Sequence, residues 1–128
     1  MFKLGKASKR NLKGVNSMLI AVIERALQIS NVDFGIPSTG GVRTADEQSV
    51  LFAIGLSNAD GYKNKSKHQT GDAFDIFAYV DGKASYEVEH LALCATAILQ
   101  AANELGISVY WGGHWRNFKD MPHFELIK

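Results

Sequence analysis

The spacing of apolar residues along the chain predicts two long helices. From Ser8 onward, apolar residues recur at intervals of three and four, the period of one helix face. A second run of this kind extends from about Tyr86 to Leu105 and is followed by Gly106, a residue type that commonly ends helices. We expect Ser8 or Asn11 to cap the first helix. The residues expected on the buried faces are Leu12, Val15, Leu19, Val22, Ile23, Ala26 and Leu27 in the first helix and Leu91, Ala95, Ile98, Ala102 and Leu105 in the second.

Thr44 and Glu47 mark the start of a shorter helix. A threonine followed three residues later by glutamate predicts a capping box, in which each side chain bonds the backbone of the other residue. We expect this helix to end at Gly55. Residues 56–73 then show no periodicity and many turn-forming residues, which predicts a long loop. Loops of that length inside compact domains are usually functional or disordered.

Short apolar stretches in the rest of the sequence predict strands. Helices come first and strands mostly last, with short connections among the strands, an order typical of an α+β fold. We expect a single domain over residues 1–128, with about three helices packed on a small, mainly antiparallel sheet. The expected strands are residues 74–80, 107–113 and 123–127, with a turn at 81–82, a short extended piece at 32–38 and a loop at 114–122.

The composition is that of an ordinary globular protein. Apolar residues make up 46% of the chain and charged residues 21%, and a net charge of +1 gives no reason to expect binding to nucleic acid. Cys94 lies in an apolar stretch and is interpreted as a small buried hydrophobic residue. We find no signal peptide and no apolar stretch long enough to span a bilayer. We therefore expect synthesis in the cytoplasm and no insertion into a membrane.

His68, Asp75 and His123 are candidate metal ligands. Asp75 begins one predicted strand, His68 lies just before it, and His123 begins the last strand. If these strands are neighbours, one end of the sheet gathers the three side chains. Two imidazoles and one carboxylate suit a catalytic zinc ion, which takes three protein ligands and keeps its fourth position for water. A polar loop without metal is the alternative, and Asp72 could replace Asp75 as a ligand.

Asp120 is the candidate general base of such a site. It stands three residues before His123, and Pro122 disfavours helical geometry at Met121, so this segment should turn. The turn can bring Asp120 beside a zinc-activated water, whose pKa falls to about 7 and whose proton a carboxylate can accept. Glu125 shares a strand face with His123 and is either a partner of that histidine or a carboxylate at the rim.

Other polar residues have weaker claims to a role. His114 follows a Gly-Gly turn near the proposed site and could contact substrate, whereas His90 lies on a predicted helix and is expected to have no metal role. The loop at 56–67 carries oxygen donors that could order around a hard cation such as Ca²⁺. A solvated polar loop explains them equally well. These donors are Asn58, Asp60 and Asn64.

Three segments resemble the metallopeptidases that act on D-alanyl-D-alanine and their phage relatives. SKHQTGDAFD, residues 66–75, resembles the Ser-x-His-x-x-Gly-x-Ala-x-Asp signature of this family, and DMPHFEL, residues 120–126, resembles its second signature. GGVRTADEQ, residues 40–48, resembles the segment that supplies an arginine to the substrate. The likeness runs from about residue 8 to the end. It is greatest to the phage L-alanyl-D-glutamate endopeptidases, whose fold is shared with the hedgehog signalling domain.

The resemblance implies a role for each candidate residue. Asp120 would be the base, and Arg43 would hold a substrate carboxylate or the developing oxyanion, which needs a cation or donor. A structural ion pair beside the capping box is the alternative for Arg43. Ser66 would either bond substrate or brace the loop, and Gly71 would give the chain room to turn beside the metal. The implied zinc ligands are His68, Asp75 and His123.

As a whole, the resemblance implies an endolysin: a zinc endopeptidase that cleaves the peptide stems of bacterial peptidoglycan between L-alanine and D-glutamate and lyses the host. It implies action in the periplasm after a partner such as a holin opens the inner membrane. We expect a monomer. One departure concerns the rim, because relatives often have an acidic residue after the Gly-Gly turn where this chain has His114.

Two other functions are compatible with the same residues. A D-alanyl-D-alanine carboxypeptidase would use the same metal site. It is disfavoured because the candidate base is aspartate rather than glutamate and because no signal peptide is found. A zinc-bearing binding module without catalysis is the second alternative, and the presence of Asp120 argues against it.

Overall fold

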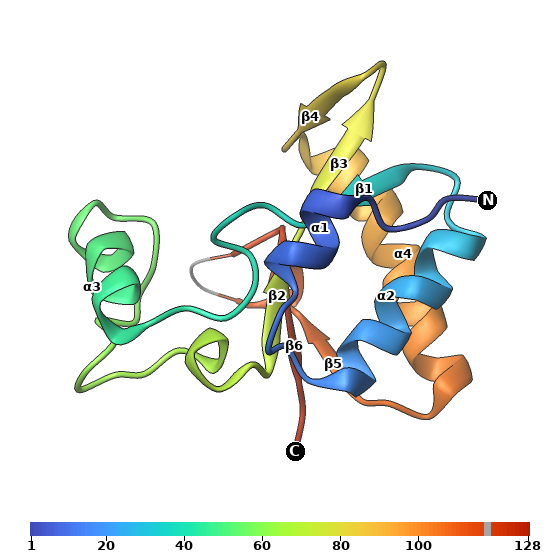
Figure 1. Cartoon of the computed structure of the whole chain (residues 1–128). Coiled ribbons are helices and arrows are strands. Elements are labelled where there is room, and N and C mark those ends of the chain that lie inside the picture. The colour runs from blue at the N-terminus through green and yellow to red at the C-terminus, as the bar shows by residue number, and fades with distance from the viewer. Residues whose placement is uncertain (117–118) are drawn as a thin grey trace.

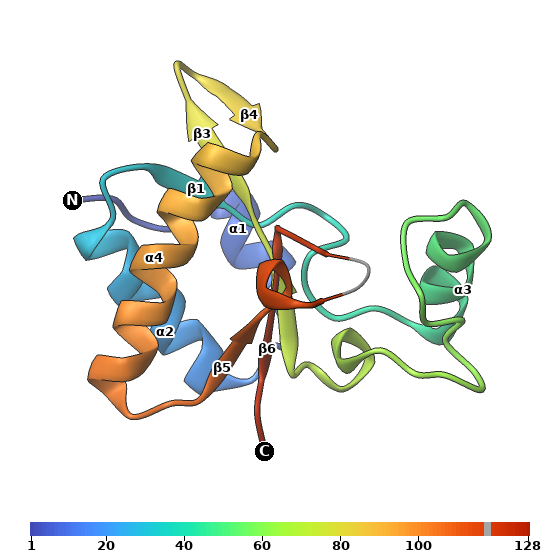
Figure 2. The ribbon, with the colours of Figure 1, turned by 180° about the vertical axis from the view of Figure 1, so that it is seen from behind.

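Four α-helices and two small antiparallel sheets make up the part of the chain that the computed structural model describes, residues 1–116 and 119–128 (Figures 1 and 2). The expected α+β class with antiparallel strands is confirmed, with four helices rather than three and two sheets rather than one. The helices are α1 (Lys6–Asn11), α2 (Ser17–Ile29), α3 (Ala45–Ala53) and α4 (Val88–Leu105), with short 3₁₀ helices η1 (Lys67–Thr70) and η2 (Gly112–His114). The strands are β1 (Asp33–Gly35), β2 (Ala73–Asp75), β3 (Phe77–Val80), β4 (Lys83–Ser85), β5 (Val109–Trp111) and β6 (His123–Leu126).

The single helix expected from Ser8 onward is two helices, so that prediction was wrong. Gly14 has a φ of 86°, which interrupts helical geometry between α1 and α2. Asn16 then caps α2, because its side chain accepts a hydrogen bond from the backbone N–H of Met18 at 2.9 Å. Ser8 lies inside α1 and Asn11 is its last residue, so neither caps α2. Apolar residues on both sides of the break are buried, which is why the spacing suggested one continuous helix.

The apolar run at residues 74–80 divides between the two sheets instead of forming one strand. The sheets have the orders β1-β3-β4 and β2-β6-β5, and the run changes sheet at Ile76. The Ile76 backbone N–H donates to the carbonyl of Pro122 at 3.0 Å, and its side chain is fully buried. The expected turn is confirmed: Asp81 and Gly82, with φ of 53° and 76°, join β3 to β4.

The main core lies between α2, α4 and the sheets. α2 and α4 pack side by side, and α4 also contacts β3 and β5. Phe74 of β2 stacks on Phe124 of β6 with ring centroids 5.2 Å apart. Cys94 of α4 is buried as expected, and burial raises the pKa of its thiol to about 12. Within the described residues, no helix is both long and apolar enough to cross a membrane.

The segment 44–65, here called the α3 arm, lies apart from this core (Figures 1 and 2). The predicted capping box is confirmed: Thr44 Oγ1 accepts from the Glu47 backbone at 3.1 Å, and Glu47 Oε1 accepts from the Thr44 backbone at 2.9 Å. α3 ends just before Gly55, as expected. The loop expected at 56–73 is interrupted by η1 and by the first residue of β2. Of the loop expected at 114–122, residues 117–118 lie outside the described residues.

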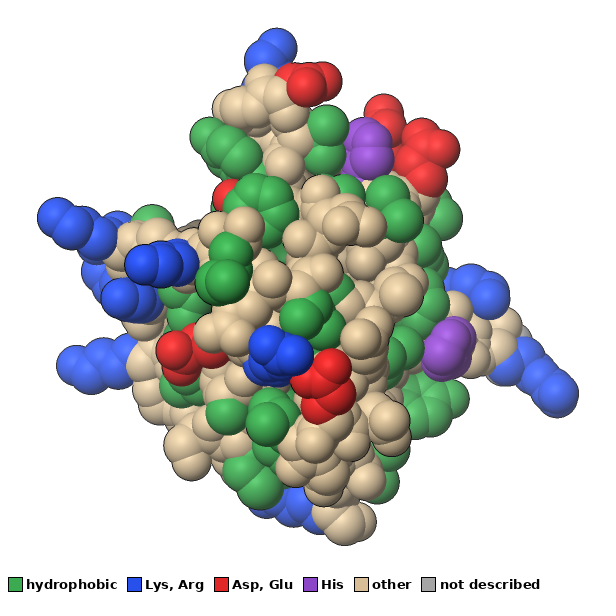
Figure 3. All heavy atoms as spheres, turned by 90° about the vertical axis from the view of Figure 1, so that its right-hand side faces the viewer, with side chains coloured by type: hydrophobic (Ala, Val, Ile, Leu, Met, Phe, Trp, Pro, Cys, Tyr) green, Lys and Arg blue, Asp and Glu red, His purple; other side chains and the backbone are tan. Residues whose placement is uncertain are grey.

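The side of the molecule that carries α2 and α4 has a mixed polar and apolar surface (Figure 3). Figure 3 shows this side, with hydrophobic side chains scattered among polar ones and with Lys and Arg projecting mainly at its edges. An ion pair between Arg25 and Glu104, 2.7 Å from Nε to Oε2, links α2 to α4 there. The candidate functional residues lie elsewhere, where β2 ends and β6 begins, near the base of the arm.

Candidate metal centre

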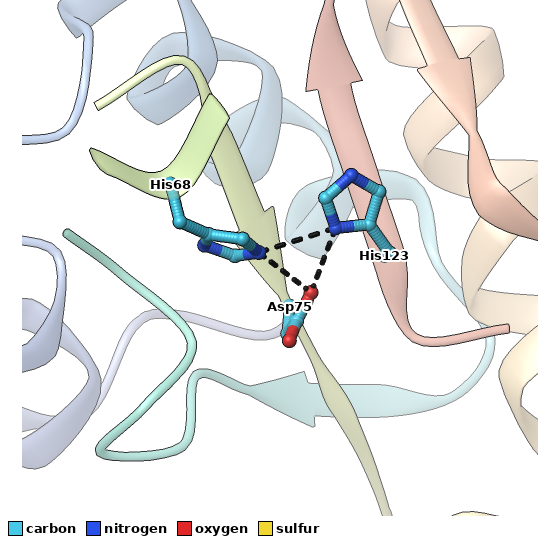
Figure 4. Close-up of side chains that lie close together, drawn as sticks. All are labelled: His68, Asp75 and His123. Atoms are coloured by element: carbon cyan, nitrogen blue, oxygen red, sulfur yellow. Dashed lines mark hydrogen bonds and ion pairs between the residues drawn. The ribbon is translucent and has the colours of Figure 1, made fainter. Parts of the chain in front are cut away.

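His68, Asp75 and His123 point at one another from three different elements (Figure 4). His68 Nε2 lies 3.2 Å from Asp75 Oδ1 and 3.1 Å from His123 Nδ1, and that nitrogen lies 3.2 Å from the same carboxylate oxygen. Asp75 of β2 and His123 of β6 are directly opposite in the antiparallel register. The prediction that these strands are neighbours is confirmed, and pairing them is what gathers the three donor atoms.

The chemistry of this donor set fits a divalent metal ion. His68 Nδ1 lies 2.9 Å from the carbonyl of Gly41, and His123 Nε2 lies 2.8 Å from Glu125 Oε1. Both outer partners are acceptors, so each neutral ring places its proton outward and turns a lone pair inward. Two lone pairs and a carboxylate oxygen facing one another repel unless a cation lies between them. A proton or a metal ion meets that need, and this combination of ligands is common in metal sites.

The electrostatics of the cluster also favour a cation between the three donors. Burial opposes the charge of Asp75, but hydrogen bonds to His123 and His68 outweigh it and hold the pKa of this carboxyl below its usual range. Burial alone would lower the pKa of His123, but Asp75 and Glu125 raise it to about 9. The surroundings of both groups therefore favour an anionic carboxylate with a positive charge beside it.

Arg43 holds the second oxygen of the candidate ligand Asp75. Its side chain is buried, and Nη2 donates to Asp75 Oδ2 at 2.8 Å. Nη1 donates to Gln48 Oε1 at 3.0 Å, and Nε donates to the carbonyl of Thr39 at 2.7 Å. Arg43 therefore forms a structural ion pair, and its partner is the candidate metal ligand Asp75. A contact between Arg43 and substrate stays a prediction.

The three donors open into a cleft of about 710 Å³ that Asp120, Arg43 and Ser66 also line. The predicted turn is present, because the His123 N–H donates to the carbonyl of Asp120 at 3.1 Å. Burial, and then the negative charge of Asp75, raise the pKa of the Asp120 carboxyl. An aspartate with a raised pKa beside a metal is suited to accept and return a proton.

Ser66 and Glu125 brace the candidate ligands. Ser66 Oγ accepts a hydrogen bond from the His68 backbone N–H at 3.2 Å and caps η1. The cap fixes the start of the short helix that carries His68. Glu125 lies between His123 and Lys67, whose Nζ is 3.3 Å from Oε2. The hydrogen bond with His123 keeps the pKa of the Glu125 carboxyl low. Glu125 is thus a partner of the histidine as well as a residue of the cleft.

The remaining candidates lie away from the donor cluster. His114 is exposed, packs edge-on against Trp111 with centroids 4.8 Å apart, and is not among the residues lining the cleft. Asp72 is bound by Lys128 at 2.8 Å and by Thr70, so it is not one of the converging donors. His90 bonds Ser85 Oγ at 2.7 Å. Its neighbours Glu87 and Glu89 could share an ion with it, but this group is at the surface.

The calcium site predicted in the loop at 56–67 stays a prediction. Asp60 Oδ1 accepts three backbone N–H bonds, from residues 62, 63 and 64, each at 2.9 Å. These bonds lower the pKa of the Asp60 carboxyl, with the largest effect from the Asn64 N–H, and they shape a tight turn.

Comparison with known proteins shows what kind of protein carries this site. A family model described as phage L-alanyl-D-glutamate peptidase matches residues 1–127. The chain belongs to this family. It is 38% identical to the L-alanyl-D-glutamate peptidase of Escherichia phage T5, over 98% of both chains. The resemblance seen in the sequence is thereby confirmed.

A bacterial enzyme and a solved structure extend the comparison. The peptidoglycan L-alanyl-D-glutamate endopeptidase CwlK of Bacillus subtilis (strain 168) is 29% identical over 77% of this chain and 64% of its own length. The crystal structure of the Serratia marcescens L-Ala D-Glu endopeptidase ChiX matches with a TM-score of 0.84 and 38% identity, over 97% of this chain and 90% of that one. The likeness therefore covers the arm and the core together.

Among the residues at or beside the cleft that the sequence did not mark as candidates are Tyr86, Trp115 and Gln48. Tyr86 and Trp115 line the cleft, and the ring of Trp115 lies 5.1 Å from that of His123. Gln48 supports Arg43 by accepting a hydrogen bond from its Nη1 at 3.0 Å. A signal for Gln48 existed, because it ends the GGVRTADEQ segment. Its partners lie in a loop without periodicity, however, and no spacing rule connects them.

Proposed function

We propose that this protein is a zinc endopeptidase that hydrolyses the bond between L-alanine and D-glutamate in the peptide stems of bacterial peptidoglycan. The observation that carries the proposal is the convergence of His68, Asp75 and His123 in a cleft that also holds Asp120, in a chain of the phage L-alanyl-D-glutamate peptidase family. Zinc is the proposed metal because two imidazoles and one carboxylate, with room for water, are typical of catalytic zinc sites.

In this proposal, His68, Asp75 and His123 would hold a zinc ion, which would act as a Lewis acid toward a water molecule and the scissile carbonyl. The chain's own residues supply orientation and proton transfer. Gly41 and Glu125 fix the two imidazoles through their outer nitrogens. Asp120 accepts a proton from the attacking water at its carboxylate and returns it to the leaving amine. Its raised pKa brings it nearer to the working pH, which favours both transfers.

Arg43 has two proposed contributions. It holds Asp75 Oδ2, and its buried positive charge stabilises negative charge that develops on the substrate carbonyl. Three of the five N–H groups of a guanidinium are used by Thr39, Gln48 and Asp75. We propose that the remaining donors face substrate. Contacts from Ser66 and His114 are further predictions, and the position of Ser66 in the cleft wall supports the first of them.

The setting of the enzyme is part of the same proposal. We propose a single domain over residues 1–128 that works as a monomer, is made in the host cytoplasm and reaches the periplasmic wall when a holin opens the inner membrane. Gel filtration tests the monomer. Expression with and without a holin, followed by measurement of culture lysis, tests the route to the wall.

The deciding experiment is mass spectrometry of purified peptidoglycan after digestion by the zinc-loaded protein. New fragments with amino-terminal glutamate should form, should disappear with a zinc chelator and should return when zinc is restored. Released D-alanine would instead identify a carboxypeptidase. No cleavage by zinc-loaded protein would identify a binding module and overturn the proposal.

Two variants test the base. Asp120→Ala should slow cleavage at least about 100-fold, the usual contribution of a general base, while zinc content stays at one ion per chain. Asp81→Asn, an exposed carboxylate in the turn between β3 and β4, should keep the full rate. A normal rate in Asp120→Ala would show that another group is the base.

A further inference from the structure

Gln48 is the one buried side chain of α3, and it is polar. Its side chain is 0% exposed, whereas the apolar residues Val50 and Ile54 of the same segment are 59% and 62% exposed. A helix normally turns its apolar side chains inward, and burying an amide costs free energy unless it is hydrogen-bonded. The burial of Gln48 therefore calls for partners that use the amide fully.

The partners of Gln48 come from two separate segments that line the cleft, at Arg43 and at residues 57–59. Oε1 accepts from Arg43 Nη1 at 3.0 Å, while Nε2 donates to Ser57 Oγ at 2.7 Å and to the carbonyl of Ala59 at 2.9 Å. The orientation of the amide is fixed by these groups, because a guanidinium only donates and a backbone carbonyl only accepts. Both amide hydrogens and the oxygen are used. Ser57 and Ala59 line the cleft.

These bonds continue to the metal centre. Besides its bond to Gln48, Arg43 donates from Nη2 to Asp75 Oδ2 at 2.8 Å. The other carboxylate oxygen, Oδ1, faces the two histidines. The guanidinium can hold Asp75 in this orientation only if its own plane is fixed. Gln48 and the carbonyl of Thr39 are the two groups that fix it. Because α3 makes no extensive contact with another helix or strand among the described residues, few other groups can tie the arm to the site.

We propose that Gln48 is a positioning residue with two functions: it orients Arg43 on the metal ligand Asp75, and it fastens residues 57–59 of the cleft wall to the same guanidinium. The second function assigns the α3 arm to substrate binding, and it rests on the proposed function. The first concerns the metal ligands alone and can be tested without substrate.

Two variants separate the functions. Gln48→Met keeps the size and the apolar stem but removes all three hydrogen bonds. Ser57→Ala removes the bond from Gln48 to Ser57 Oγ, together with the bond that this hydroxyl accepts from the Ala59 backbone, and leaves Arg43 bound to Gln48. Val50→Ala, on the exposed side of the same helix, controls for a general effect on α3. Each variant is prepared with zinc, and its fold is checked by circular dichroism.

Zinc affinity is measured first, by competition with a coloured chelator in the absence of substrate. Gln48→Met should bind zinc about 10-fold or more weakly, the usual effect of removing the support of a metal ligand. Ser57→Ala and Val50→Ala should bind as the parent does. Equal affinity in a folded Gln48→Met protein would overturn the first function. If Gln48→Met does not fold, Gln48→Asn replaces it, because the shorter amide cannot reach both Arg43 and residues 57–59. Weaker zinc binding would then support the first function, and equal affinity would overturn it.

Steady-state kinetics with a soluble stem peptide containing the L-alanyl-D-glutamyl bond are measured second, at saturating zinc. Ser57→Ala should raise KM several-fold with kcat nearly unchanged, and Val50→Ala should change neither. An unchanged KM in Ser57→Ala would overturn the second function. If the zinc-loaded parent does not cleave the peptide at all, the proposed function fails, and the loss of zinc affinity in Gln48→Met still supports the first function.

Discussion

The helical layer of α2 and α4 and the α3 arm are built on opposite principles. α2 buries five apolar side chains, and α4 covers them from the other side. α3 buries only Gln48 and leaves Val50 and Phe52 exposed, and Ile54, directly after the helix, is exposed as well. The first region is held by removing apolar surface from water, and the second by hydrogen bonds to groups near the candidate metal centre.

This difference separates stability from function. Apolar burial in the helical layer sets the free energy of global unfolding, since that layer contains most of the core. The arm contributes little buried apolar surface, so it can open locally while the rest stays folded. Its bonds to Arg43 and to the cleft wall nevertheless make it part of the site. We expect variants in the two regions to fail in different ways.

The largest expected difference is between matched truncations of apolar side chains. Leu27 of α2 is fully buried, and Leu27→Ala should lower the free energy of unfolding by about 2–5 kcal/mol. Val50→Ala in the arm should change it by less than about 0.5 kcal/mol. Urea denaturation of both proteins measures the two values. A cost for Val50→Ala equal to that of Leu27→Ala would show that the arm belongs to the cooperative core.

The two helix caps offer a finer test. Asn16 caps α2 and Thr44 caps α3, and loss of either should cost about 1 kcal/mol. Asn16→Ala should show this loss in global unfolding. Thr44→Ala should leave global unfolding unchanged and instead speed hydrogen exchange at the α3 amides, because the arm opens on its own. If Thr44→Ala lowers the global free energy by the same amount, the two regions unfold together.

The smallest expected effect is on acid stability. The Lys128 ammonium, with Thr70 and Asn16, holds the pKa of Asp72 below its usual value against the effect of burial. A carboxyl whose pKa is lower in the folded protein stabilises the fold at pH values above its unfolded pKa of about 3.9. This stabilisation is lost as the pH falls through the pKa of the folded state. Asp72→Asn should therefore reduce the loss of stability in acid, by less than about 1 kcal/mol.

Asp60 is the matched carboxyl in the arm. Its pKa is also lowered, mainly by the backbone N–H of Asn64, but it is exposed. Asp60→Asn should leave the acid limb of global unfolding unchanged, because the unit that Asp60 stabilises opens separately. Denaturation curves between neutral and acid pH compare the three proteins. A flatter acid limb in Asp60→Asn would contradict the separation of the two regions.

Local signals in the sequence correctly predicted those helix starts and turns whose geometry depends on neighbouring residues. The Thr44 capping box and the turn at Asp81 and Gly82 were correct because their partners lie within a few positions. The break at Gly14 was missed, since apolar spacing continues across it and reports burial rather than continuity. The division at Ile76 was missed for a related reason: an apolar run shows that a strand is buried but not which strands it pairs with.

The candidate site was more predictable from sequence than the arm that supports it. His68, Asp75 and His123 stand in signatures whose order and spacing pointed to one cluster, and the structure brings them together. Gln48 stands in the segment GGVRTADEQ, but nothing in that segment indicated that its side chain is buried. Whether a polar helix residue faces water or a buried arginine depends on tertiary contacts, and here its partners come from residues 43, 57 and 59.

The pairing of β2 with β6 also has a consequence for the timing of synthesis. Asp75 and His123 meet across 48 positions of the chain, and His123 comes from the final strand. A nascent chain on the ribosome carries the first two proposed ligands long before the third exists. A site of this kind forms only when the last strand joins its sheet. A metal ion held by all three proposed ligands would therefore bind only after synthesis has passed residue 123.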